Sequence, residues 1–226
     1  MVYYNLKVTL MLKEDIKYEN TYEKLANLIS LSMLNNEKMK EFHEKNCYKF
    51  YNFCSLYPFE KDGIYKKNKI YIFDIRFVDL QFATTLKQLL DRVNGSSFKI
   101  IMSNLQVNEY RKINKLISLT PCVLTTPKGD YDIKDDLELV KTRITANAEK
   151  KYKEIYNEKI SCDFIKSITK INRTPIKLPY KNMHFLGNKF EIEVEQDENS
   201  QKLAYLLLST GTLEKNSIGF GFVKAR

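Results

Sequence analysis

The 226-residue chain is poor in glycine, cysteine and histidine, and it has no long hydrophobic run. Its four cysteines are scattered without a CxxC pair or a metal-like Cys/His spacing, so the sequence suggests neither a zinc site nor a disulfide framework. We expect buried, reduced thiols at Cys47, Cys54, Cys122 and Cys162. No apolar stretch approaches the ~20 residues that a transmembrane helix needs. The amino terminus alternates like a strand and lacks the pattern of a secretory signal, so we expect a cytoplasmic protein that is not bound to a membrane.

Basic residues outnumber acidic ones, with 37 Lys and Arg against 28 Asp and Glu and a formal net charge of +9. Both halves of the chain share this excess. It favours a polyanionic partner such as nucleic acid, although many lysine-rich proteins bind none. The length allows either one large core or two domains of roughly 100 residues each.

The first half follows the order β-α-β-β-α-β. Residues 2–12 alternate with a period of two and predict a strand. A single long helix is expected over 20–45, capped by Asn20 or Thr21. The runs 48–59 and 69–78 predict an antiparallel strand pair joined by a lysine-rich turn. A short helix is expected over 80–93, where Asn94-Gly95 ends it, and a further strand over 97–110.

The second half repeats this order. The segment "TPCVLTT", residues 120–126, predicts an opening strand, and a helix is expected over 132–158. After it we expect a strand over 162–171 and a hairpin-like strand pair over 182–195. A helix over 200–210 and a final strand over 217–225 complete the unit. The predicted class is α+β, with two tandem ferredoxin-like domains over 1–118 and 119–226. In such a unit one sheet face can stay open for a ligand.

Three of the seven glycines fall in the last sixteen residues, "GTLEKNSIGFGFVKAR". Gly211 follows the predicted helix, where a C-cap glycine is common. Gly219 and Gly221 interrupt an alternating strand, which indicates a bulge or a closely approaching backbone. The loop between the expected helix and strand also holds polar side chains that, with nearby amides, suit phosphate oxygens: Thr212, Lys215, Asn216 and Ser217.

This ending resembles the carboxy-terminal signature of the RAMP-superfamily CRISPR endoribonucleases, the sixth Cas protein family. The resemblance rests on "GTLEKNSIGFG", on the preceding "LGNKFEIEVE" and on a helix that ends in glycine. It extends through the doubled ferredoxin-like order and "TPCVLTT", so it covers most of the chain. The family usually has a second glycine early in the loop, where this chain has Leu213.

The resemblance implies a metal-independent endoribonuclease without a cofactor that cuts CRISPR repeat RNA in precursor transcripts. In such a reaction the ribose 2′-hydroxyl attacks the adjacent phosphate and leaves a cyclic phosphate and a 5′-hydroxyl. A base, a group that stabilises the phosphorane charge and an acid are required. The resemblance assigns the RNA backbone to the terminal loop, with Gly211, Lys215, Asn216, Ser217, Gly219 and Gly221.

The chain has only two histidines, which narrows the search for a proton-transfer group. His43 is followed six residues later by Lys49. This arrangement is similar to the family's catalytic one, and it implies His43 as general base or acid and Lys49 as the charge partner of the phosphate. The alternative is a helix-end histidine that is favoured by the helix dipole and has no role in chemistry. His184, expected on a strand, is the second candidate.

Some family members use a tyrosine late in the first helix, where this chain has Ser30 and Ser32. Tyr48 or Tyr51 can replace it, or His43 and Lys49 can act alone.

Lys66 and Lys67, in the predicted turn "YKKNK", are candidates for binding the RNA backbone, and a solvated lysine turn is the alternative.

A non-catalytic RAMP-type RNA-binding subunit of a CRISPR effector complex is the rival function, and an RNA binder unrelated to CRISPR is a more distant one. The resemblance also allows a homodimer and association with an effector complex, and no stretch of the sequence marks an interface.

Overall fold

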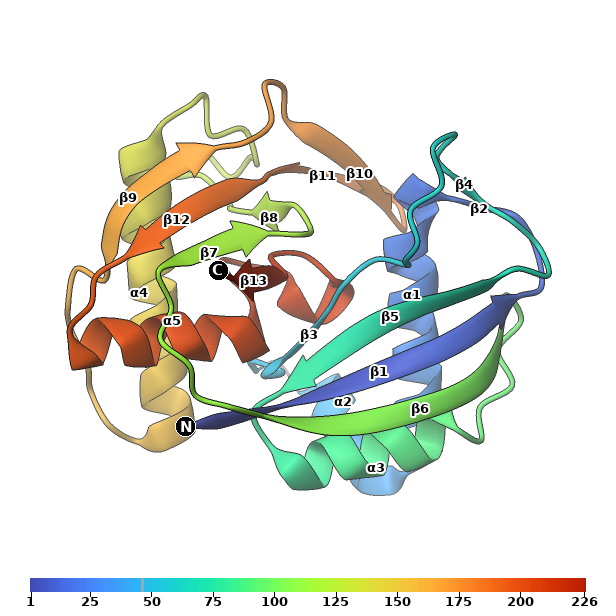
Figure 1. Cartoon of the computed structure of the whole chain (residues 1–226). Coiled ribbons are helices and arrows are strands. Elements are labelled where there is room, and N and C mark those ends of the chain that lie inside the picture. Colours follow the sequence, from blue (N-terminus) through green and yellow to red (C-terminus); the bar gives the residue numbers. More distant parts are fainter. Residues whose placement is uncertain (46) are drawn as a thin grey trace.

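The first sheet has four antiparallel strands in the order β3-β5-β1-β6 (Figure 1). The structure, a computed structural model, describes residues 1–45 and 47–226. Leu6, Val8 and Leu10 alternate along the central strand and are fully buried in a core shared with α1 and α3. The elements of this unit are β1 (Val2–Leu12), β2 (Ile16–Lys17), α1 (Tyr18–Met33), α2 (Glu37–Glu44), β3 (Tyr51–Phe53), β4 (Ile64–Tyr65), β5 (Ile70–Phe77), α3 (Leu80–Leu90) and β6 (Phe98–Glu109).

The single long helix expected over 20–45 is wrong, because the chain forms α1 and α2 with a break between them. Asn36 adopts an extended conformation, and its side chain accepts a hydrogen bond from the backbone N–H of Met39. It is therefore the N-cap of a new helix. The start was also misplaced: Lys17 precedes the first helical residue, and Asn20 and Thr21 lie inside α1.

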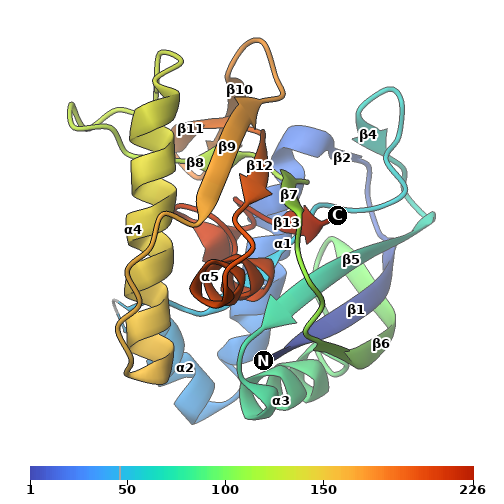
Figure 2. The same ribbon diagram turned by 60° about the vertical axis from the view of Figure 1, so that its left-hand side comes forward.

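The second sheet has the order β13-β7-β12-β9 and is also antiparallel. Its elements are β7 (Lys115–Ser118), α4 (Leu137–Tyr156), β9 (Ile165–Lys170), β12 (Phe190–Val194), α5 (Glu198–Thr210) and β13 (Val223–Ala225). Figure 2 shows α5 in the middle of the molecule, and it contacts α4 and the first sheet as well as its own. Two mixed units of helix and antiparallel sheet thus lie side by side, as the sequence predicted.

The opening strand and the hairpin expected in the second half were wrong. The second sheet opens with β7 and not with the expected strand over 120–126. The chain passes from the first sheet to the second between β6 and β7, a few residues before the expected domain boundary after residue 118. The segment 120–126 contributes only β8 (Cys122–Val123), which joins β10 (Ile176–Tyr180) and β11 (Met183–Asn188) in a separate small sheet. The strands β11 and β12 follow each other directly but belong to different sheets, so they form no hairpin.

The expected strand over 217–225 is mostly irregular. A 3-10 turn covers Asn216–Ile218, and only β13 pairs with the sheet. Gly219 and Gly221 both have positive φ, which a regular strand does not allow. No helix in 1–45 and 47–226 is both long and apolar enough to span a bilayer.

Arg76 on β5 joins the two units. Its guanidinium donates to the carbonyl oxygens of Leu208 on α5 (3.0 Å) and Val223 on β13 (2.6 Å). It also lies over the ring of Phe222, 4.1 Å from the centroid. Burial lowers the pKa of this side chain. The contact fixes α5 and the end of the chain against the first sheet.

Replacing Arg76 by methionine is expected to lower the free energy of unfolding by about 2–5 kcal/mol, because two buried carbonyl oxygens lose their donor. Urea unfolding measures the change. Arg92→Met is the matched control, since Arg92 is exposed and its loss changes the charge equally. If the two variants were equally stable, Arg76 would not hold the units together.

Candidate nucleic-acid interface and active site

A cavity of about 380 Å³ lies between the segment that follows α2, the helix α4 and the glycine-rich loop. We define this loop as residues 211–221. Four lysines line the cavity with a single carboxylate, that of Glu214: they are Lys45, Lys49, Lys151 and Lys215. Tyr48, Asn147 and Ser217 add polar groups. An excess of ammonium groups and hydroxyls around a hollow suits a phosphodiester.

The three glycines of the loop are buried, and the atoms closest to them belong to the chain itself. A Cβ on Gly211 would lie 2.1 Å from the side-chain nitrogen of Asn52, and one on Gly221 would lie 2.1 Å from the carbonyl oxygen of Thr212. A Cβ on Gly219 would meet the ring of Phe53 at 2.6 Å. The close approach predicted from the sequence is therefore present, and its partner in the structure is the protein.

The polar residues of the loop have different environments. Lys215 is exposed, and its ammonium lies 5.9 Å from the ring centroid of Phe185. Ser217 is partly buried and lines the cavity. The side chain of Asn216 is used inside the loop, where it donates to the carbonyl oxygens of Thr212 and Phe220, both at 2.9 Å. Lys215 and Ser217 are thus the loop side chains best placed to meet a ligand.

His43 lies in the last turn of α2 and is partly buried. Its pKa is lowered from 6.5, mainly by burial and then by the positive charges of Lys49 and Lys181, whereas Glu44 opposes the shift. Lys181 lies in the turn between β10 and β11 of the second unit, so both units contribute to the surroundings of His43. The imidazole of His43 is consequently neutral near pH 7.

Lys49 caps the end of α2. Its ammonium donates to the carbonyl oxygens of Phe42, His43 and Lys45, at 3.0 Å in the case of His43. A positive charge is favourable there because the last carbonyls of a helix have no partner within the helix. Burial lowers the pKa of Lys49. This lysine therefore holds the backbone that carries His43 and also lines the cavity.

Tyr48 points toward α4 and not toward the end of α2. Its hydroxyl accepts a hydrogen bond from Asn147 at 3.3 Å, and the ammonium of Lys150 lies 5.3 Å from its ring centroid. Its pKa is raised, first by burial and then by Glu154 and Glu214, so the phenol stays protonated. Tyr51 is buried, and burial likewise raises its pKa.

His43 and the remaining candidate residues are not among the residues that line the cavity. His184 is exposed on β11, opposite Pro179. Ser32 is buried and donates to the carbonyl oxygen of Leu28 at 2.8 Å, whereas Ser30 is partly buried. Among the described residues, no group of three His, Cys, Asp or Glu side chains is arranged to hold a metal ion.

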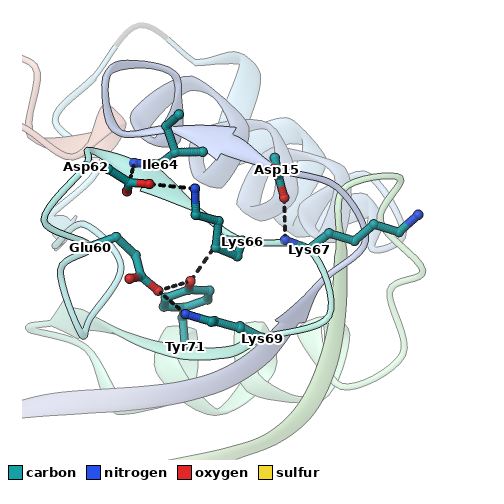
Figure 3. A network of polar contacts seen from close by, with 8 residues as sticks. All are labelled: Asp15, Glu60, Asp62, Ile64, Lys66, Lys67, Lys69 and Tyr71. Carbon is teal, nitrogen blue, oxygen red and sulfur yellow. Dashed lines mark hydrogen bonds and ion pairs between the residues drawn. The ribbon is translucent and has the colours of Figure 1, made fainter.

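Lys66 and Lys67 occupy the predicted turn, between β4 and β5 (Figure 3). The ammonium of Lys66 is paired with Asp62 at 2.6 Å. Lys67 uses its backbone N–H to bind Asp15 at 2.7 Å, and Figure 3 shows its side chain pointing away from the network. Lys69 is paired with Glu60 at 3.1 Å. Two of the three lysines of this turn are thus neutralised by acidic neighbours.

Residues 103–225, the second unit and the end of the first, match the family model of the C-terminal part of CRISPR associated protein Cas6. The chain belongs to the Cas6 family. This match spans more than half of the sequence, and it confirms the family that the terminal loop predicted.

Full-length comparisons agree with this membership. The chain is 27% identical to "CRISPR-associated endoribonuclease Cas6 2" of Methanocaldococcus jannaschii, covering 96% of this chain and 98% of that protein. A solved structure of a CRISPR associated protein Cas6 superposes with a TM-score of 0.76 at 21% identity over 99% of both chains. A RAMP protein binding different RNA substrates gives a TM-score of 0.79 at 18% identity, again over 99% of both. These structures confirm the tandem ferredoxin-like fold.

Two positively charged residues of the site were missed by sequence reasoning. Lys181 was not considered, because it approaches His43 only through the packing of the β10–β11 turn, where its backbone N–H binds Glu23 of α1 at 2.9 Å. Lys151 lies in the stretch "EKKYKE", whose alternating charges are typical of a solvent-facing helix surface, yet its side chain is buried. A helical-wheel analysis could have found it, since Lys151 is three residues from the buried Ala148 and seven from Ile144.

Proposed function

We propose that the chain is a metal-independent endoribonuclease that cuts CRISPR repeat RNA in precursor transcripts, by attack of a ribose 2′-hydroxyl on the adjacent phosphate. The observation that carries this proposal is His43: its imidazole is partly buried, its pKa is lowered by burial and by the positive charges of two lysines, and it lies at the end of a helix whose cap, Lys49, also lines the cationic cavity. The relative from Methanocaldococcus jannaschii, named as a CRISPR-associated endoribonuclease, supports the endoribonuclease activity.

His43 is the proposed general base. A histidine with a pKa below 6.5 is mainly unprotonated at pH 7, and it can accept the 2′-hydroxyl proton as the oxygen attacks phosphorus. The attack forms the 2′-O–P bond and breaks the bond from phosphorus to the 5′-oxygen. The products are a 2′,3′-cyclic phosphate and a 5′-hydroxyl.

Lysines supply the charge that the phosphorane needs. Lys49 and Lys181 place positive charge near His43, and Lys215 and Ser217 add donors at the wall of the cavity. Because burial lowers the pKa of Lys49, its ammonium gives up a proton more readily than an exposed lysine does. This property suits protonation of the leaving 5′-oxygen.

The test is cleavage of a labelled repeat RNA, from the genome that encodes the chain, in excess EDTA. We expect a single cut and complete resistance of the cleavage to EDTA. The terminal phosphate at the 3′ end should be removed by phosphatase only after acid has opened the cyclic phosphate. A 2′-deoxy substitution at the cut nucleotide should abolish the cut. Cleavage of the deoxy RNA, or loss of activity in EDTA, would contradict the mechanism, and binding without cleavage would favour a non-catalytic RNA-binding subunit.

A further inference from the structure

Lys151 is a buried lysine in α4 whose side chain is 2% exposed. Within the part of the chain that the structure describes, no carboxylate forms an ion pair with it. Burial lowers its pKa to about 7. Removing an ammonium group from water is costly unless hydrogen bonds or a counter-charge compensate. The fold therefore tolerates an unfavourable residue at the wall of the cavity.

Among the described residues, the acceptors of the Lys151 side chain all belong to the glycine-rich loop. Its Nζ donates to the carbonyl oxygen of Gly211 at 2.8 Å and to the side-chain oxygen of Asn216 at 2.7 Å. The carbonyl oxygen of Leu213 is a more distant acceptor at 3.5 Å. One ammonium thus binds the beginning and the middle of the loop.

The contact with Lys151 also fixes the amide of Asn216. Carbonyl oxygens can only accept, so the amide must turn its nitrogen toward the two carbonyl oxygens of the loop and its oxygen toward Lys151. That nitrogen then donates to the carbonyl oxygens of Thr212 and Phe220, which lie on the two sides of the loop. Lys151 and Asn216 together form a brace across the loop.

The loop needs such a brace because its backbone is strained. Leu213 has a φ of +57° and Lys215 a φ of +59°, a left-handed conformation that residues other than glycine adopt only at an energetic cost. Local strain of this kind persists only where surrounding contacts enforce it. The strained conformation is the one in which Lys215 and Ser217 line the cavity.

We propose that Lys151 is a positioning residue, which holds the loop in the shape that presents Lys215 and Ser217 to the RNA phosphates. This inference rests on the proposed function, since it takes RNA as the ligand. Lys151 also lines the cavity, so a bound phosphodiester supplies the negative charge that the protein does not provide there. RNA binding and the brace then stabilise each other.

The test compares Lys151→Met with Lys153→Met. Lys153 lies in the same helix, is exposed, and its loss changes the net charge equally. We expect Lys151→Met to raise the KM for repeat RNA about tenfold or more, while kcat at saturating RNA is reduced less than twofold. Lys153→Met should leave KM within about twofold of the wild type. Lys151→Arg, which keeps the charge and donors, should recover part of the affinity.

Two further measurements separate positioning from a loss of folded protein. A smaller folded fraction lowers the apparent kcat and leaves KM unchanged, which is the opposite pattern. Hydrogen exchange should show faster exchange at the amides of Thr212 and Gly221, which donate to the carbonyl oxygens of Gly221 at 2.9 Å and of Pro121 at 2.8 Å, respectively. If Lys151→Met does not fold, Asn216→Ala removes the same brace without changing the helix and should raise KM in the same way.

An unchanged KM in folded Lys151→Met, or in Asn216→Ala, would overturn the inference. Affinity for repeat RNA with a 2′-deoxy cut site is measured in parallel, because it does not depend on cleavage. A wild-type protein that fails to bind this RNA would overturn the proposed function as well. A wild type that binds and cleaves, with variants indistinguishable from Lys153→Met, would overturn only the role of Lys151.

Discussion

Replacing His43 by alanine is expected to lower the rate of repeat-RNA cleavage by about 10²- to 10⁴-fold, the usual contribution of a positioned general base. The affinity for RNA should change less than about twofold, because the imidazole is neutral near pH 7 and contributes no charge to binding. Single-turnover cleavage and fluorescence anisotropy measure the two quantities separately.

The pH dependence of kcat/KM gives a second measure of the same residue. The base must be unprotonated and the acid, Lys49, protonated, so the rate should rise with pH through the pKa of His43 and fall again at higher pH as Lys49 loses its proton. Since that pKa is lowered in the folded protein, the midpoint of the rise should fall below 6.5. Lys181→Met removes one of the positive charges that lower it, so the midpoint should move to higher pH.

His184→Ala is the control for His43→Ala. His184 is exposed on a strand, and the same substitution there should leave the rate and its pH dependence unchanged. If His43→Ala cleaved RNA as fast as wild type, His43 would be an ordinary helix-end histidine. If His184→Ala were the inactive variant, the base would have to be reassigned to the second unit.

Much of the fold could be predicted from local pattern. The strands β1 and β5 alternate with a period of two, and α3 and α4 show helical periodicity that matches their buried faces, whereas α5 is buried on almost every side. The break between α1 and α2 was missed because both sides carry helical periodicity, and the capping role of Asn36 depends on one backbone conformation. Periodicity describes which face is buried and says little about where a helix restarts.

Sheet membership and the site were harder to predict, for a different reason. The run 182–195 has the expected strand pattern, but the change of sheet between β11 and β12 is decided by distant partners. His43 and Lys49 were selected because the chain has only two histidines and because a histidine followed by a lysine at this place is similar to the family's catalytic arrangement. Lys181 reaches the site only through tertiary packing, so neither spacing nor composition could place it there. The helical spacing of Lys151 could have indicated that its side chain is buried, but not that it binds the glycine-rich loop.

The glycines show the same limit on a finer scale. The sequence indicated that a backbone comes close to Gly219 and Gly221, and we interpreted that backbone as RNA. In the structure a carbonyl oxygen of the loop, that of Thr212, occupies the space beside Gly221, and the two residues are joined by a hydrogen bond of 2.9 Å from the N–H of Thr212. The sequence signal was a steric requirement, and it did not name the partner.

Gly221→Ala is therefore expected to destabilise the fold strongly and to weaken RNA binding through the loop. Alanine at a φ of +71° costs about 1–2 kcal/mol in backbone strain. Its Cβ would lie 2.1 Å from the oxygen of Thr212, and overpacking of this kind adds typically about 1–3 kcal/mol. The expected loss in the free energy of unfolding is about 3 kcal/mol or more.

Gly63→Ala separates the cost of backbone strain from the cost of the steric collision. Gly63 has a nearly identical φ of +72°, and a Cβ there meets no atom within 4 Å, so this variant carries the backbone strain without the collision. Urea unfolding should show a loss of about 1–2 kcal/mol for Gly63→Ala and a clearly larger one for Gly221→Ala. Equal losses would mean that Gly221 is needed only for its backbone conformation. A larger loss at Gly221, accompanied by weaker RNA binding, would mean that the internal packing of the loop also shapes its RNA-binding surface.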